Sequence, residues 1–168
     1  MKTTFLKSML GIFILCLAVM LNIKTSEASV LDGAKEWNGH YYKIIEMQMD
    51  WSSADKFCKS MGGYLAVPNT REENEILKNM VLSRGKGKNL LYWIGGYSSD
   101  KGLWRWVTGQ PITNFYDWAK GEPYRSTAKY CIVLADYVDG QWKAYFNEYP
   151  ELFICEWESK DTAHDSTM

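Results

Sequence analysis

The change from helix to strand that decides the fold lies in residues 51–67, WSSADKFCKSMGGYLAV. Apolar residues recur here at helical spacing and form one face, made of Trp51, Ala54, Phe57, Cys58 and Met61. Ser52, with Asp55 three residues on, has the pattern of an N-cap, and Gly62-Gly63 ends the predicted helix. Residues 64–67 then form a predicted short strand.

A second helix is predicted directly after this strand. Thr70 and Glu73 have the spacing of a capping box. The apolar face continues at helical spacing with Ile76, Leu77, Met80 and Val81. The basic, glycine-containing run RGKGK at 84–88 ends the helix.

Short strand patterns account for most of the remaining sequence. They fall at 39–45, 91–94, 103–107, 130–134, 141–145 and 152–157. An irregular stretch, 108–128, separates two of them, and a loop this long inside a compact domain is usually functional. Two helices followed by a set of short strands predict a single α+β domain.

The N-terminus has the pattern of a secretory signal peptide. Two lysines precede an apolar run at 9–21, and small residues at Ser26 and Ala28 predict cleavage after Ala28. The run is shorter than the roughly 20 residues that a membrane span needs. We therefore expect a signal peptide at 1–28, a domain at 29–158 and a frayed polar tail at 159–168. The protein is expected to be secreted, without membrane insertion after cleavage.

Charge and cysteine content restrict the partners. Cleavage removes three lysines and one glutamate and changes the formal charge from −1 to −3, which argues against nucleic acid as a partner. Cys58, Cys131 and Cys155 remain, so an oxidising environment favours one disulfide and leaves one thiol. Their spacing does not suit a metal site.

The sequence also argues against an enzyme. The cleaved chain has only two histidines, His40 and His164, and it lacks the Gly-x-Ser-x-Gly, His-Glu-x-x-His and phosphate-loop motifs. The carboxylate pair Glu72-Glu73 is explained by its place at a helix N-terminus, where negative charge is favourable.

Short motifs from about Trp37 to Glu158 together resemble the C-type-lectin-like domain family. In chain order they are GHYY at 39–42, SAxxxC at 53–58, GGYLA at 62–66, EEN at 72–74, WIGG at 93–96, WxWVTG at 104–109, YxWxxGEP at 116–123 and FICE at 153–156. The resemblance implies a looped fold of two helices and two small antiparallel sheets whose termini meet. It also implies a Cys58–Cys155 disulfide and a ligand site in the long loop. Such a bond would close nearly the whole domain and stabilise it by about 4–5 kcal/mol.

The family's second disulfide lacks one cysteine in this chain. Trp142 precedes Cys155 by thirteen positions, which matches the family's Trp-Asn-Asp segment and places the missing partner at Asn147. Cys131 is therefore expected to be free. It could be a reactive thiol or an intermolecular bridge, but the apolar residues 132–134 beside it favour a buried thiol.

Lectins of this family bind sugar through a calcium ion, and most of the implied ligand positions have changed here. Glu122-Pro123 remains, while Tyr124, Lys129, Lys143 and Ala144 occupy the other positions. Calcium takes about six to eight oxygen ligands, and a nearby cation adds repulsion. We therefore expect no calcium and no other cofactor. A shifted register that uses Asn147-Glu148 would restore two oxygens but would break the spacing to Cys155.

The predicted function is a glycan-binding module without the usual calcium site. The alternative is calcium-independent recognition of an extracellular protein, or surface assembly through Cys131. Aromatic and charged residues of the long loop and its neighbours are the candidate ligand-binding residues: Tyr116, Trp118, Glu122, Pro123, Tyr124, Lys129 and Lys143, with Tyr149 as a further stacking ring. Trp118 and Trp142 could equally belong to the core.

Lys143 has a specific expected role. The register brings Lys143 and Glu122 to the same place, so we expect the ammonium to lie within about 6 Å of the carboxylate and to replace the charge of the ion. Arg125 and Lys129 would then leave surplus positive charge that favours an acidic ligand. The alternative is that these cations are solvated surface residues.

Overall fold

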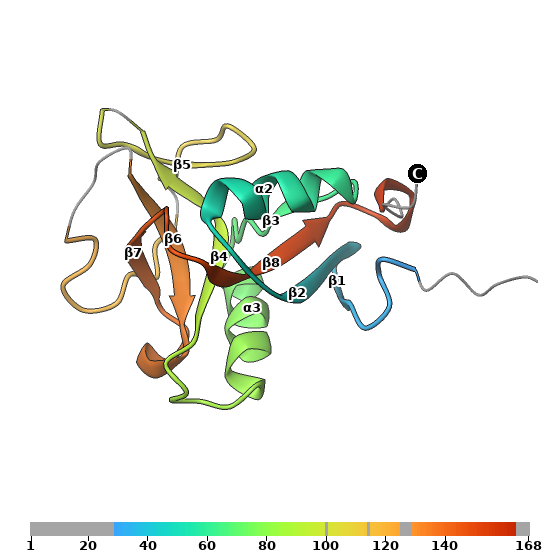
Figure 1. Ribbon diagram of the computed structural model, residues 1–168, viewed down its shortest axis with the longest axis horizontal. Coiled ribbons are helices and arrows are strands. Elements are labelled where there is room, and N and C mark those ends of the chain that lie inside the picture. The colour runs from blue at the N-terminus through green and yellow to red at the C-terminus, as the bar shows by residue number, and fades with distance from the viewer. Residues whose placement is uncertain (1–28, 100, 114, 125–128, 164–168) are drawn as a thin grey trace, which may run out of the picture.

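The computed structural model describes residues 29–99, 101–113, 115–124 and 129–163. Two α-helices are present in this part, α2 (Trp51–Ser60) and α3 (Arg71–Ser83), and eight strands form one sheet (Figure 1). The strands are β1 (Lys35–Trp37), β2 (His40–Met49), β3 (Tyr64–Leu65), β4 (Leu91–Ser98), β5 (Trp104–Trp106), β6 (Tyr130–Ala135), β7 (Trp142–Phe146) and β8 (Glu151–Trp157). The α+β class predicted from the sequence is confirmed.

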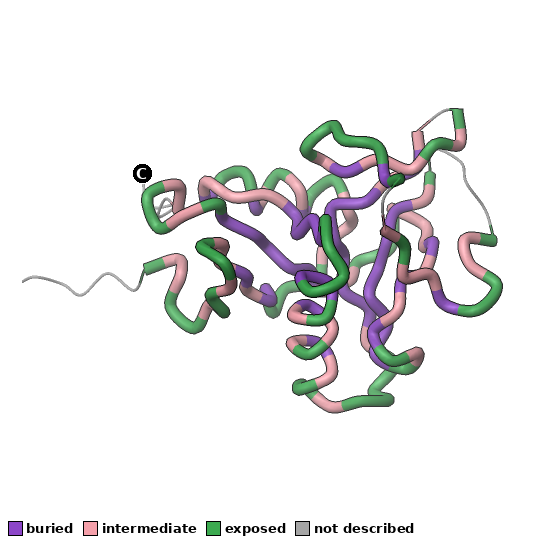
Figure 2. The backbone as a smooth tube through the Cα atoms, turned by 180° about the vertical axis from the view of Figure 1, so that it is seen from behind, coloured by how far each residue is buried: buried purple, intermediate pink, exposed green. Residues whose placement is uncertain are grey.

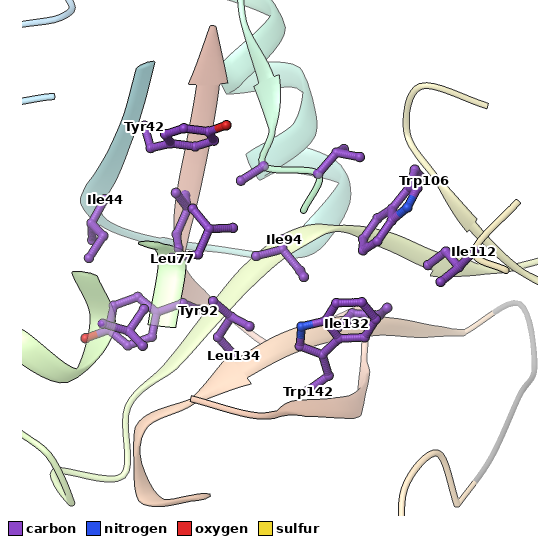
Figure 3. Packing of buried hydrophobic residues seen from close by; sticks show 14 residues of the cluster. Tyr42, Ile44, Leu77, Tyr92, Ile94, Trp106, Ile112, Ile132, Leu134 and Trp142 are labelled. Carbon is purple, nitrogen blue, oxygen red and sulfur yellow. The ribbon is translucent and has the colours of Figure 1, made fainter. Parts of the chain in front are cut away.

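Alternation along the central strands divides the core into two clusters. Phe153 and Cys155 of β8 face the cluster that contains Ala54 and Cys58 of α2, while Ile154 faces the opposite cluster. That second cluster, drawn in Figure 3, includes Leu77 and Val81 of α3 with residues of β4 and β6. Because both faces of β8 are covered, its residues 153–157 are all buried, as the continuous buried stretch in Figure 2 shows.

The sheet differs in one respect from the two antiparallel sheets implied by the resemblance. Its order is β1-β2-β8-β4-β6-β7, with β3 on β8 and β5 on β4. β8 pairs antiparallel with β2 and parallel with β4, through Tyr92–Leu152 and Trp93–Phe153. The last strand thus joins the two antiparallel parts into one mixed sheet, because it lies between them.

The helix starts follow the predicted segments but not every predicted cap. Asp50, not Ser52, caps α2, and its carboxylate accepts hydrogen bonds from the backbone N–H (3.0 Å) and hydroxyl of Ser53. Ser52 follows Trp51, the first residue of the helix and of its apolar face, so the cap is the residue before Trp51. Thr70 caps α3 as predicted.

Glu73 completes the α3 cap differently from a capping box. Its carboxylate accepts a hydrogen bond from the N–H of Asn69, at 2.8 Å, instead of the N–H of Thr70. The other carboxylate oxygen accepts the hydroxyl of Tyr42 in β2. The helix start is thereby attached to the sheet.

The cysteines behave as the resemblance implies. Cys58 of α2 and Cys155 of β8 are bonded, across 97 positions of sequence. Cys131 is free and buried, and its burial raises the pKa of the thiol. In the β6–β7 ladder it lies opposite Tyr145. The expectation of a buried, unpaired thiol is therefore confirmed.

The two ends of the described chain lie on the same side of the molecule (Figure 1). β1 and the short 3-10 helix η2 (Lys160–Thr162) were not predicted. η2 corrects the expectation of a frayed tail for these residues, since Lys160 lies over the ring of Tyr41 and Ala163 packs against the core. No helix among the described residues is long and apolar enough to cross a membrane. The predicted signal peptide and residues 164–168 lie outside the described residues.

We expect the disulfide to contribute a large share of the stability. A double Cys58→Ala, Cys155→Ala variant should lose about 4–5 kcal/mol of unfolding free energy, because the unfolded chain is no longer restricted across 97 positions. Equilibrium urea unfolding of both proteins measures the difference. A Cys131→Ala variant is the matched control and should lose much less, and equal losses in the two would contradict this account.

Candidate ligand-binding site

A buried tryptophan connects the long loop to the core. Trp142 begins β7 with no exposed surface, and its indole N–H donates to the Oδ1 of Asn74 in α3, at 2.8 Å. The rings of Trp106, Phe115 and Trp118 pack edge-on against it, with centroids 5.5, 5.5 and 5.6 Å away. Figure 3 shows Trp142 beside Ile132 and Trp106. The indole therefore connects β7, α3 and the loop.

Backbone hydrogen bonds hold the loop beside the same strand. The N–H of Trp142 donates to the carbonyl of Asp117, at 2.8 Å, and its carbonyl accepts the N–H of Ala119, at 2.9 Å. The Asp117 carboxylate accepts the Asn74 side-chain amide, at 2.7 Å, and pairs with Lys78 of α3, at 3.0 Å. The loop thus approaches β7 as an extra, partly paired segment.

Glu122 and Lys143 meet where this segment runs alongside β7. The Lys143 ammonium lies 3.0 Å from Oε1 of Glu122. The backbone N–H groups of Tyr124 and Ala144 donate to Oε2, at 3.2 and 3.3 Å. The Glu122 side chain is only 7% exposed, so its carboxylate is satisfied by the protein. The predicted approach of Lys143 to Glu122 is confirmed.

Lys143 is charged in this setting. Burial lowers its pKa, but the hydrogen bond to Glu122 and the nearby charges outweigh burial and raise the pKa. The ammonium also lies 5.8 Å from the ring centre of Tyr137. Tyr137 belongs to a short 3-10 helix, η1 (Asp136–Val138), which was not predicted, so the sequence offered no signal for this contact.

The other predicted residues divide into exposed and packed groups. Tyr124 and Tyr116 are exposed, and Tyr116 donates its hydroxyl to the carbonyl of Ile112. Trp118 packs against Trp104, with ring centres 4.9 Å apart, so its ring serves the attachment of the loop. Pro123 follows Glu122 through a cis peptide bond.

The surplus of positive charge was predicted from Arg125 and Lys129, and only Lys129 belongs to the described residues. Lys143 is neutralised by Glu122, and Lys129 is exposed with its ammonium 5.6 Å from the ring centre of Phe146. Arg125 lies outside the described residues. Lys129 is thus an exposed cation, and no carboxylate among the described residues pairs with it.

A second polar cluster lies where β2, β3, β8 and α3 meet. His40, Glu73 and Glu156 offer ligand atoms within 4.8 Å of one another, so they are the described residues that could hold a metal ion. Both carboxylates already accept internal hydrogen bonds. Glu156 accepts from His40, at 2.8 Å, and from the N–H of Val67, at 2.8 Å. The cluster thereby joins the strands that carry the two ends of the domain.

The pKa of Glu156 is raised to about 7, because burial disfavours its charged form and the Glu73 carboxylate adds repulsion, against the hydrogen bond from Val67. Burial alone would lower the pKa of His40, but its hydrogen bond to Glu156 and the surrounding carboxylates raise it. Both groups therefore hold protons more tightly in the folded protein than in the unfolded chain.

Comparison with known proteins gives a consistent family. The family model described as "Lectin C-type domain" matches residues 47–157. A perlucin-like protein of Mytilus galloprovincialis is 27% identical over 134 residues, which cover 79% of this chain and 85% of that protein. The galactose-specific lectin nattectin of Thalassophryne nattereri is 26% identical over 149 residues, with coverage of 86% and 91%.

A solved structure has the same fold. The calcium-independent C-type lectin SPL-2 of Saxidomus purpuratus superposes with a TM-score of 0.65 at 25% sequence identity, and the match covers 75% of this chain and 91% of that one.

The His40–Glu156 cluster predicts a stability that falls as pH rises. Because both folded-state pKa values lie above the ordinary ones, the folded protein binds more protons than the unfolded chain. The contribution is present at low pH and is lost as pH rises through about 7. The midpoint of thermal unfolding, measured between acid and mildly alkaline pH, should fall over this range.

A Glu156→Gln variant separates this cluster from other titrating groups. The amide keeps the shape of the side chain but does not titrate, so the pH dependence should become markedly weaker. Glu36→Gln, at an exposed position of β1, is the control and should keep the wild-type profile. An undiminished slope in Glu156→Gln would refute the assignment.

Proposed function

The chain belongs to the C-type lectin domain family, and on that premise we propose that it is a secreted, non-catalytic module that binds glycans without a calcium ion at Glu122. The observation that carries this proposal is the contact between Lys143 and Glu122, at 3.0 Å. A lysine ammonium occupies the place where the family resemblance implies an ion.

The residues around Glu122 do not fit calcium. Calcium requires about six to eight oxygen ligands, usually with several carboxylates. The two oxygens of the Glu122 carboxylate already accept from an ammonium and two backbone N–H groups of the described residues. Ala144, the next residue of β7, has no side-chain oxygen. An ion at this place would also be repelled by the ammonium of Lys143.

The same contacts explain how the loop keeps its place without an ion. Glu122 connects the segment that carries Tyr124 to β7 through Lys143 and the N–H of Ala144. A partly exposed ion pair contributes only about 0–1 kcal/mol to stability. The main effect of this pair is therefore to position the loop segment beside β7. A loop that is ordered before binding avoids part of the entropic cost of ordering it in the complex.

The exposed groups beside this pair suit a sugar. Tyr124, whose N–H donates to Glu122, and Tyr137, which lies beside Lys143, present exposed aromatic rings with hydroxyl groups. Tyr116 is a further exposed ring of the same loop as Tyr124. Pyranose rings have an apolar C–H face and a polar rim, and such C–H groups are attracted to the negative face of an aromatic ring. Nattectin, by its name a galactose-specific lectin, and the calcium-independent SPL-2 are relatives that support the same proposal.

A non-catalytic role is supported by the state of the buried carboxylates. Glu73 and Glu156 are engaged in internal hydrogen bonds from Tyr42, Asn69, His40 and Val67. Among the described residues they are the buried glutamates, and each of their oxygens already accepts at least one internal hydrogen bond. A general acid or base needs access to a bound substrate.

A glycan array tests the proposal. The secreted protein should give the same binding pattern with added calcium and with excess chelator. A Lys143→Glu variant should lose about tenfold or more in affinity for the glycans bound, because two carboxylates would repel each other and displace the loop. Lys59→Glu, at an exposed position of α2, is the control and should bind as the wild type does.

Binding that disappears with chelator would contradict the calcium-independent site. Failure to bind any glycan, together with Lys143-dependent capture of a purified extracellular protein, would favour protein recognition instead.

A further inference from the structure

A row of aromatic side chains runs from the Glu122 loop along the end of the sheet. Tyr124 packs edge-on against Tyr130 with centroids 5.8 Å apart, and Tyr130 packs edge-on against Phe146 at 5.7 Å. Phe146 then contacts Tyr149 at 6.1 Å. These four residues, which we call the aromatic strip, come from the loop, β6, β7 and the turn that follows β7 (Figure 1).

The aromatic strip is not part of either core cluster. Tyr124 is 61% exposed and Tyr149 is 53% exposed, while Tyr130 and Phe146 are partly exposed. None of the four belongs to the two groups of buried residues or to the side chains packed against them. Folding therefore does not account for four adjacent rings at this place, and contiguous exposed apolar surface indicates a binding site.

The rings are held in place before any ligand arrives. Tyr130 and Phe146 are directly opposed in the β6–β7 ladder. The N–H of Tyr149 donates to the carbonyl of Phe146, and the N–H of Tyr124 donates to Glu122. The edge-to-face contacts lie in the distance range that aromatic pairs prefer. A row fixed by backbone pairing loses little freedom on binding.

Its dimensions favour a narrow ligand over a protein. A fully buried aromatic side chain covers about 150–250 Å², so four partly exposed rings offer roughly a few hundred Å². A stable protein interface needs about 800 Å² on each partner. The aromatic strip is one ring wide along each of its contacts, which suits an extended chain of sugar rings.

The polar groups beside the strip agree with a sugar ligand. The hydroxyls of Tyr124 and Tyr130 lie 3.4 Å apart at one end and can both donate and accept. The ammonium of Lys129 stands over the Phe146 ring and adds a donor without a carboxylate partner among the described residues. Sugar hydroxyls need such alternating donors and acceptors along the edge of an apolar surface.

We infer that the aromatic strip is an extended subsite that binds a linear oligosaccharide of several sugar units, continuing from the site at Glu122 and Lys143. This inference rests on the proposed glycan-binding function and adds the size class of the ligand. Its consequence is that affinity grows with chain length, because each further sugar reaches another ring.

A length series tests the inference. The probes are linear oligosaccharides of one to six units from the β-1,4-linked glucose, N-acetylglucosamine, mannose and xylose series, immobilised at equal density. At least one series should bind about tenfold more tightly as the tetramer than as the monosaccharide. Tyr149→Ala should remove this gain and leave monosaccharide binding intact, while Tyr149→Phe should retain it.

Leu103→Ala, at an exposed position on the turn between β4 and β5, is the matched control and should leave the series unchanged. Because Tyr149 is more than half exposed, its variants should fold, and unchanged thermal midpoints verify this. Tyr124→Ala provides a second variant at the other end of the strip.

The outcomes separate this inference from the proposed function. Equal affinity for the monosaccharide and the longer oligosaccharides would overturn the role of the strip and leave the glycan site at Glu122 standing. So would a Tyr149→Ala variant that keeps the whole gain in affinity with length. No binding in any series would overturn the role of the strip, while the proposed glycan-binding function would still be decided by the glycan array. Tyr149-dependent self-association in sedimentation equilibrium would also overturn this role, by assigning the strip to contact with a second copy of the chain.

Discussion

The buried indole of Trp142 is the interaction on which the arrangement of the loop depends. It is fully enclosed, donates to Asn74 of α3 and receives the edges of three rings, while its backbone pairs with Asp117 and Ala119. Because side chains alternate along a strand, burying Trp142 turns Lys143 to the opposite face of β7. The ammonium then meets Glu122 from the attached loop, so one buried residue sets the geometry of an exposed site.

Much of the fold was predictable because it depends on periodic patterns. The faces of α2 and α3, the strand segments and the Cys58–Cys155 bond follow from apolar spacing and the family resemblance, and they are confirmed. The parallel pairing of β8 with β4 was not predicted, because it joins residues about sixty positions apart that share no local pattern. The cap of α2 is Asp50 and not the predicted Ser52. Serine and aspartate are both preferred at helix N-caps, so residue type alone did not decide between them.

The part of the site that could be predicted is the contact between Lys143 and Glu122, because it follows from the spacing of the family's motifs. The family resemblance, applied to the spacing from Trp142 to Cys155, implied the register that brings Lys143 to Glu122. The hydrogen-bonded pair Asn74–Asp117 and the contact of Lys143 with Tyr137 depend on how a loop and a 3-10 helix fold, and these contacts have no sequence pattern. The aromatic strip likewise becomes visible only when the β6–β7 register sets Tyr130 opposite Phe146.

The central claim is that Lys143 and backbone amides, not an ion, hold Glu122 and its loop. The most direct measurement is hydrogen exchange at the amides of Tyr124 and Ala144, which both donate to Glu122. We predict equal protection of these two amides with excess calcium and with excess chelator, and lower protection in Glu122→Ala. Protection that rises when calcium is added to the wild-type protein, and not to Glu122→Ala, would contradict the claim.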